Sequence, residues 1–247
     1  MNLRPRAALP VLMMTIRNLF SRWLLASLLA AAMPALAGPC DAVLQRWQTD
    51  ENAVLAELAP VFQQGREDGS IQVELRALPD CATELRLQLP AADLEQTRQY
   101  LEQNPAKRIL MSAQGYAIPE QTESVVTIAA NEAHPAELKA LNQGLEFMYQ
   151  LLTQLRANIP AGQQNQQAWP LALQQSQLHA CRQAWQAADL TSACQCRLEQ
   201  LSASIPPRQM ALITYLQQQP YATATGALSS FNTLSQSILH SCQLQPR

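Results

Sequence analysis

The sequence has little of what most enzyme active sites are built from. Its 247 residues include only three histidines and seven glycines. No histidine lies in an H-E-x-x-H pattern, no serine lies in G-x-S-x-G, and no glycine-rich loop is present that would cradle a phosphate. The carboxylate pairs Asp50-Glu51 and Glu67-Asp68 are expected to lie on solvated surface. The sequence therefore predicts a non-enzymatic protein with no catalytic residue and no cofactor.

Clusters of basic residues and long apolar runs are also missing after the first 37 residues. The basic residues of 38–247 are scattered, so nothing could follow a phosphate backbone and nucleic-acid binding is disfavoured. No apolar run in this part approaches the ~20 residues that a membrane-spanning helix needs. We therefore expect a soluble mature chain that has no membrane span and does not bind nucleic acid.

The first 37 residues have the pattern of a cleavable signal peptide. They carry four arginines and no acidic residue, then an apolar run from Trp23 to Met33 and the small-residue site Ala35-Leu36-Ala37. A basic stretch, a short apolar core and an A-x-A site together form the secretory pattern. We predict that residues 1–37 are removed by cleavage after Ala37. The mature chain would then begin at Gly38 in the periplasm, with 13 Lys and Arg against 19 Asp and Glu.

Two details of this segment leave alternatives open. Translation from Met13 or Met14 would give a leader of ordinary length. Cys40 lies close to the cleavage site, as in a lipoprotein, but Pro39 precedes it where the lipobox has Gly, Ala or Ser. Lipidation of Cys40 is therefore not the preferred interpretation.

Six cysteines follow the leader, and an even count in an exported chain indicates a disulfide framework. They are Cys40, Cys81, Cys181, Cys194, Cys196 and Cys242. Cys194 and Cys196 point about 200° apart on a helix, so they reach two different neighbours. The spacing leaves the pairing of these two open. Apolar stripes favour Cys181–Cys194 and Cys196–Cys242, which leaves Cys40–Cys81 by elimination.

The same region offers a metal-binding alternative. His179-Ala-Cys181, Cys194-Gln-Cys196 and His240-Ser-Cys242 are pairs of ligands that zinc or copper(I) accepts. The spacing of two residues, however, aims each histidine away from the stripe that carries its cysteine. The thiols would also have to stay reduced in an oxidising compartment. No residue is therefore assigned as a metal ligand.

A β-hairpin is the clearest local structure in the sequence. Apolar and polar residues alternate in 71–76 and again in 84–89, on either side of Pro79-Asp80-Cys81. A turn centred on Asp80 places opposite charges on one face and apolar residues on the other. The register pairs Arg76 with Glu84, Glu74 with Arg86, Leu75 with Leu85 and Val73 with Leu87.

Residues 38–159 are predicted to form an α+β domain around this hairpin. Helices are expected at Asp41–Phe62 (with a break near Pro60), at Ala91–Gln103 and at Pro135–Asn158. A second hairpin would join Arg108–Ala113 to Ser124–Ala129. This order suggests two related α-β-β units of packed helices and antiparallel hairpins.

The helix predicted at Pro135–Asn158 carries an apolar stripe with alternating spacings of three and four residues. Its members are Leu138, Leu141, Leu145, Met148, Leu152 and Leu155. The spacing fits a core helix that lies across the hairpins, or a seam that contacts a dimer partner or another protein. With the open edges of the hairpins, this stripe is the candidate interaction surface.

The carboxy-terminal part is predicted to be helical, because the patterns that indicate strands are absent from it. A Gln-rich linker is predicted at 160–170, followed by four short helices in 171–247 that disulfides staple together. Ser192 is expected to cap the second of these helices, and Pro206-Pro207 to start the third.

Together these features predict a periplasmic binding or assembly module of the bacterial envelope. Its expected partner is another envelope protein, with a homodimer as an alternative. The rival functions are a periplasmic copper or zinc protein and an envelope hydrolase with a dispersed active site.

Overall fold

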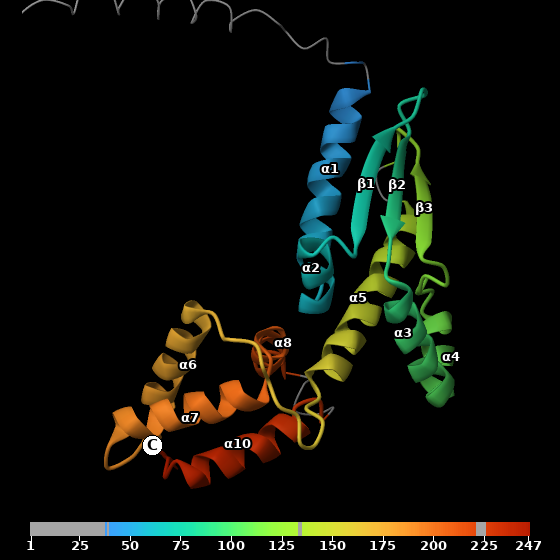
Figure 1. The fold of residues 1–247 in the computed structure, drawn as a ribbon. Helices are drawn as coiled ribbons and strands as arrows, with labels where there is room; N and C mark the ends of the chain where they lie inside the picture. Colours follow the sequence, from blue (N-terminus) through green and yellow to red (C-terminus); the bar gives the residue numbers. More distant parts are fainter. Residues whose placement is uncertain (1–37, 39, 133–134, 221–225) are drawn as a thin grey trace, which may run out of the picture.

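The computed structural model describes residues 38, 40–132, 135–220 and 226–247 (Figure 1). The predicted signal peptide, its cleavage after Ala37 and the alternative starts at Met13 and Met14 lie outside the described residues. Within the part of the chain that is described, no helix has both the length and the apolar content for crossing a bilayer.

The first half of the chain is an α+β unit, as predicted. Its elements in chain order are α1 (Asp41–Ala56), α2 (Pro60–Glu67), β1 (Gln72–Ala77), β2 (Thr83–Gln88), α3 (Ala91–Gln103), α4 (Pro105–Ala113), β3 (Glu123–Ile128) and α5 (Ala136–Ala157). The strands form one antiparallel sheet in the order β1-β2-β3. Helices α1 and α5 contact the sheet, and α3 and α4 lie beyond its end (Figure 1).

The predicted hairpin is confirmed, including its register. β1 and β2 are antiparallel partners, and their opposing residues include the pairs Arg76 with Glu84, Glu74 with Arg86, Leu75 with Leu85 and Val73 with Leu87. On the inner face, Leu85 and Leu87 are buried. On the outer face, Arg86 forms ion pairs with Glu84 and Glu123 at 3.3 and 3.4 Å. The alternation of the sequence therefore separates a core face from a charged face.

The predicted second hairpin is wrong. Residues 105–113 form helix α4, which Pro105 starts from a first-turn position where its missing N–H costs nothing. The strand expected at Ser124–Ala129 does exist as β3, but it pairs with β2 and places Val126 opposite Leu85. Because β3 completes a single three-stranded sheet, the described residues do not contain a second α-β-β unit.

Helix α5 is the central element of this half. Five of the six stripe residues are buried, with Leu145 at 1 % and Met148 at 0 % exposure, and only Leu155 is half-buried. Phe62 of α2 meets Tyr149 edge to face with ring centroids 4.9 Å apart. The stripe therefore lies in the chain's own core, and the interaction surface proposed from its spacing is not exposed in this chain.

The second half consists mainly of helices, as the vanished strand signals predict. They are α6 (Leu171–Ala184), α7 (Leu190–Ser204), α8 (Pro207–Gln217) and α10 (Ser229–Ser241), and a short antiparallel pair joins β4 (Trp185–Gln186) to β5 (Gln245–Pro246). The cap of α7 is Asp189, whose Oδ1 accepts from the Ser192 backbone N–H at 3.1 Å. Ser192 is therefore not the cap that the sequence predicts. It lies within the first turn of α7 and donates its backbone N–H to the cap residue, Asp189.

Three disulfides confirm the predicted framework. Cys40–Cys81 ties the start of α1 to the β1–β2 turn, Cys181–Cys194 joins α6 to α7, and Cys196–Cys242 joins α7 to the end of α10. The sulfur of Cys40 is therefore engaged and does not offer a thiol for lipidation. The thiolates that the metal alternative requires are oxidised as well.

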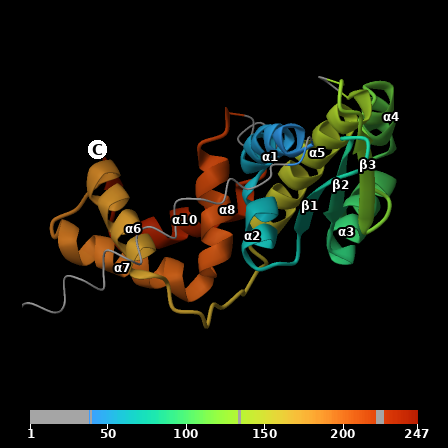
Figure 2. The ribbon, with the colours of Figure 1, turned by 90° about the horizontal axis from the view of Figure 1, so that it is seen from above.

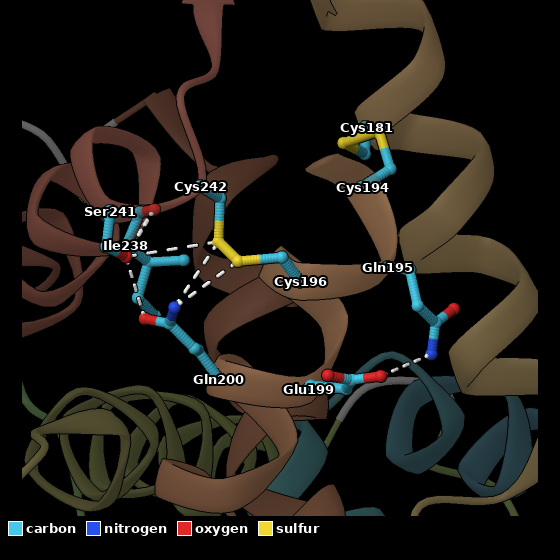
Figure 3. Close-up of a disulfide and its surroundings, with 9 residues drawn as sticks. All are labelled: Cys181, Cys194, Gln195, Cys196, Glu199, Gln200, Ile238, Ser241 and Cys242. Carbon is cyan, nitrogen blue, oxygen red and sulfur yellow. Dashed lines mark hydrogen bonds between the residues drawn. A yellow bond between two sulfur atoms is a disulfide. The ribbon is translucent and has the colours of Figure 1, made fainter. Parts of the chain in front are cut away.

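The two disulfides on α7 leave its axis in opposite directions, as Figure 3 shows. Gln200 lies one turn after Cys196, and its side-chain amide donates to both sulfurs of Cys196–Cys242 at 3.4 Å. The Ser241 hydroxyl donates to the side-chain oxygen Oε1 of Gln200 at 3.0 Å. The two-residue spacing of Cys194 and Cys196 thus makes α7 the hub of the second half.

The segment predicted as a linker packs along the end of α7. The Asn165 backbone N–H donates to Ala203 O at 2.7 Å, and the buried Trp169 indole donates to Ile205 O at 2.8 Å. Helix α8 then contacts α2 and α5. Arg208 pairs with Asp68 at 2.8 Å, and Gln209 donates to Asn158 O at 2.7 Å. The second half therefore packs directly against the first.

Candidate binding groove

A groove of about 1150 Å³ lies between α3, α4 and the segment 116–122. Its floor is apolar, because Leu94 and Leu101 of α3 meet Met111 of α4 and Ile118 of the segment. Leu101 and Met111 are buried under it at 9 % and 5 % exposure.

The rim of the groove is charged. It carries three carboxylates and two guanidinium groups, from Glu95, Glu102, Glu120, Arg98 and Arg108. Arg98 is already paired with Glu95 of the same helix. The groove therefore offers an apolar trough whose edges carry a small excess of negative charge.

The first wall, α3, is fixed to α5 through an ion pair whose carboxylate is buried and whose guanidinium is half-buried. Asp93 is 3 % exposed, and its Oδ1 lies 2.5 Å from Nη2 of Arg156. The Arg156 Nε donates to Gln96 Oε1 at 3.1 Å, and the Thr97 hydroxyl donates to Asp93 O within α3 at 2.8 Å. Asp93 and Gln96 thus anchor α3 to α5 through Arg156, while Leu94, Glu95 and Arg98 of the same helix line the groove.

The second wall, α4, meets α3 at a sharp corner. Asn104 ends α3 and precedes Pro105, and its side-chain amide donates back to Tyr100 O at 2.8 Å. The Lys107 ammonium lies 5.0 Å from the centre of the Tyr100 ring. The corner leaves α4 with only Met111 buried.

The third wall is the segment 116–122, which is held at both ends. The Leu89 N–H donates to Thr122 O at 2.7 Å, and the Ala117 N–H donates to Ala140 O of α5 at 3.0 Å. Ala117 also lies directly on Gly144, where a Cβ would come within 2.2 Å of the Ala117 carbonyl oxygen. Only glycine permits this close approach of the two backbones.

The ionisable side chains of the groove lining are carboxylates, guanidinium groups and the Tyr116 phenol. Its lining contains no histidine and no cysteine. Elsewhere in the described ranges, no three His, Cys, Asp or Glu side chains gather closely enough to hold a metal ion. His179 and His240 are exposed, and His134 lies outside the described residues.

One carboxylate departs from its expected place. Asp50 is exposed as predicted, but Glu51 is only 2 % exposed on the inner side of α1. Burial raises the pKa of Glu51 above its ordinary value, and the hydrogen bond from Asn142 Nδ2 at 3.3 Å offsets this only in part. Its second oxygen has no partner. Glu51 lies outside the groove lining and is a buried, incompletely hydrogen-bonded part of the core.

Sequence reasoning missed the groove because it assigned α4 to a strand. The available signal was Pro105 followed by a strongly amphipathic stretch, which is typical of a helix start. Comparison with known protein families, with curated proteins and with solved structures gives no match for this chain. The groove must therefore be interpreted from its own chemistry.

Proposed function

We propose that this protein is a periplasmic, non-enzymatic binding or assembly module of the bacterial envelope. Its groove between α3, α4 and 116–122 would take an apolar segment of another envelope protein. The observation that carries the proposal is an open trough with an apolar floor and a charged rim, built on walls that are each tied to the rest of the fold.

Two features support the proposed compartment. Disulfides form and persist in oxidising environments outside the cytoplasm, and the described cysteines are all paired. The basic, apolar and A-x-A pattern of residues 1–37 supports export by a cleaved signal peptide. Both features support a periplasmic location.

The dimensions of the groove favour a chain segment over a small molecule. Small-molecule sites usually enclose ~300–1,000 Å³ and surround most of the ligand. This groove, at about 1150 Å³, is slightly larger and is partly open to solvent. The excess of carboxylates on the rim favours a partner segment that has apolar side chains for the floor and Lys or Arg beside them.

The first test fills the groove. Random peptides are selected on the immobilised mature chain, and their binding to variants is measured by fluorescence anisotropy. Ser112→Trp places an indole inside the lining, whereas Gln114→Trp adds the same side chain to exposed surface just after α4. We expect selected peptides rich in apolar and basic residues that bind Ser112→Trp at least about tenfold more weakly and Gln114→Trp unchanged.

A second measurement uses the protein in its own compartment. A photo-crosslinking amino acid at position 112 should yield one discrete adduct with another envelope protein, and the same group at position 114 should not. Peptides that bind both tryptophan variants equally, together with no adduct specific to position 112, would show that the groove is not a docking site.

A further inference from the structure

The outer edge of strand β3 carries a row of backbone groups that point away from the sheet. The Leu89 N–H donates to Thr122 O, so these two residues are a hydrogen-bonded pair of the antiparallel ladder. Such pairs alternate along a strand with pairs that are not hydrogen-bonded. The positions of β3 that bond to β2 are therefore Ser124, Val126 and Ile128. The positions whose N–H and C=O groups point outward are Glu123, Val125 and Thr127. Within the described ranges, no backbone hydrogen bond uses these outward groups.

This edge lacks the features with which proteins usually protect an exposed strand. β3 is an end strand of its sheet, and Figures 1 and 2 show it on the side away from α1. Its pairing with β2 runs from Glu123 to Ile128 without a bulge. The strand contains no proline, glycine or lysine, and its only charged residue is Glu123 at its start. Val125, at its centre, is 45 % exposed. The edge can therefore accept another strand.

The order of residues along β3 makes the strand complementary to itself. A two-fold axis at Val125 places a second β3 antiparallel to the first, and the outward groups of all three positions then meet across the axis. On the outer face, Val125 lies opposite Val125 of the second copy. On the inner face, Ser124 lies opposite Val126. Glu123 lies opposite Thr127, so no two carboxylates face each other directly. An interface between identical copies requires this kind of self-complementarity.

From this arrangement we infer that two copies of the chain pair along β3 and join their three-stranded sheets into one continuous antiparallel sheet. The row of outward N–H and C=O groups selects a strand as the occupant, because an extended backbone presents matching groups at the same spacing. The match of faces and charges about Val125 selects a second copy of this chain over a strand of another protein. The two-fold axis closes the contact, so neither β3 keeps a free edge.

The pairing also determines where the two grooves of a dimer lie. The groove lining ends at Thr122, directly before the start of β3. Because the two copies of β3 run in opposite directions, the grooves lie at opposite ends of the joined sheet. A dimer would therefore offer two separate docking sites for envelope partners. This pairing goes beyond the proposed binding of a protein segment and does not depend on it, since no residue of β3 lines the groove.

The test measures the mass of the mature chain by sedimentation equilibrium over a range of concentrations. We expect a reversible equilibrium between monomer and dimer. Val125→Lys places two ammonium groups opposite each other at the axis and should raise the dimer Kd at least about tenfold. The matched control is Val54→Lys, because Val54 is 44 % exposed but lies on α1. This variant should form dimers like the native chain, and urea unfolding of both variants verifies that each is folded.

A second readout tests the register. Val125→Cys lies opposite its own copy at a Cα separation of about 5.5 Å, which a disulfide can span, so the dimer should cross-link under oxidising conditions. Glu123→Cys should not cross-link, because the axis at Val125 separates its two copies by roughly 13 Å along the strands. Both results are read from non-reducing gels.

Four outcomes would overturn the proposal. They are a native chain that stays monomeric at every concentration, equal dimer formation by Val125→Lys and the native chain, a cross-link at position 123 but not at 125, and a photo-crosslinking amino acid at position 125 that captures only another envelope protein. In the last case a strand of a different protein would occupy the edge. Because Val125 does not line the groove, peptide binding to Val125→Lys tests the proposed function separately.

Discussion

Replacing Gly144 by alanine should disturb the groove from a position outside it. Gly144 lies on α5, where an added Cβ would be 2.2 Å from the Ala117 carbonyl oxygen, 2.6 Å from its carbon and 3.0 Å from Ile118 N. These are backbone atoms, so no side-chain rotation relieves the contact. The Ala117 N–H is also bonded to Ala140 O, which holds this wall against α5. The substitution must therefore push the wall outward.

The expected change in the free energy of unfolding is the sum of two losses and one gain. An ordinary contact requires the wall to move by about 1 Å, which breaks or stretches the Ala117–Ala140 hydrogen bond at a cost of about 1 kcal/mol. Overpacking adds about 1–3 kcal/mol. Alanine regains about 1 kcal/mol relative to glycine inside a helix. The net loss of stability is about 1–3 kcal/mol, or a fall in Tm of about 3–9 °C for a chain of this size.

Urea unfolding of the mature chain measures the stability, and anisotropy with the selected peptides measures the groove. Glu146→Ala, at an exposed position of the same helix, controls for helix propensity. We expect Gly144→Ala to lose both stability and peptide affinity, and Glu146→Ala to lose neither. A Gly144→Ala protein that is more stable than the native chain and binds peptide normally would refute the reasoning.

Three further variants test other parts of the fold. Replacing Cys40 and Cys81 together by serine opens a link between residues 41 positions apart, and urea unfolding should show a loss of about 4 kcal/mol; an unchanged midpoint would contradict this. Glu51→Gln should remove a pH dependence: burial raises the pKa of Glu51 above 4.5, so its contribution is full below that pH and is lost as pH rises through the raised value. Urea midpoints measured from about pH 4 to about pH 8 should therefore fall for the native chain relative to the variant, and parallel curves would contradict this. Trp169→Phe leaves the Ile205 carbonyl unpaired at a position with 0 % exposure, and thermal unfolding should report a loss of about 1–3 kcal/mol.

Local sequence patterns predicted the parts of the fold in which the spacing of neighbouring residues is enough to determine the structure. The β1–β2 register follows from strict alternation, since a slip of one residue would expose the apolar face. The limits of α3 agree because Pro90 precedes its first turn and Asn104-Pro105 ends it. The pairing of Cys194 and Cys196 with different partners follows from their spacing on one helix.

The parts that could not be predicted depend on contacts between distant residues. Ile109-Leu110-Met111 is a short apolar run, which periodicity alone does not assign to strand or helix. The free edge of β2 accepts β3, so no local partner strand is needed. The groove depends on the close backbone contact between Gly144 and Ala117, and neither segment has a sequence pattern that predicts this contact.

Glu51 is different, because the sequence did contain a signal. Trp47, Glu51 and Leu55 are four residues apart and fall on one face of α1, and all three are buried. A carboxylate in the middle of an apolar stripe should have been assigned to the core. The expectation of solvated surface treated Asp50 and Glu51 as a pair, although neighbours in a helix point about 100° apart.

The final test asks whether the boundary predicted at 160–170 separates two independently stable domains. Helix α8 of the second half packs against the first half. Ile213 and Leu216 of this helix have 0 % exposure, and α8 contacts both α2 and α5. Part of the surface of α5 is therefore buried only when the second half is folded. For this reason we expect one calorimetric transition for the whole chain. Ile213→Ala should shift that single transition downward by the equivalent of about 2–5 kcal/mol. Two transitions, of which only one responds to Ile213→Ala, would show instead that 38–159 and 171–247 are independently stable domains.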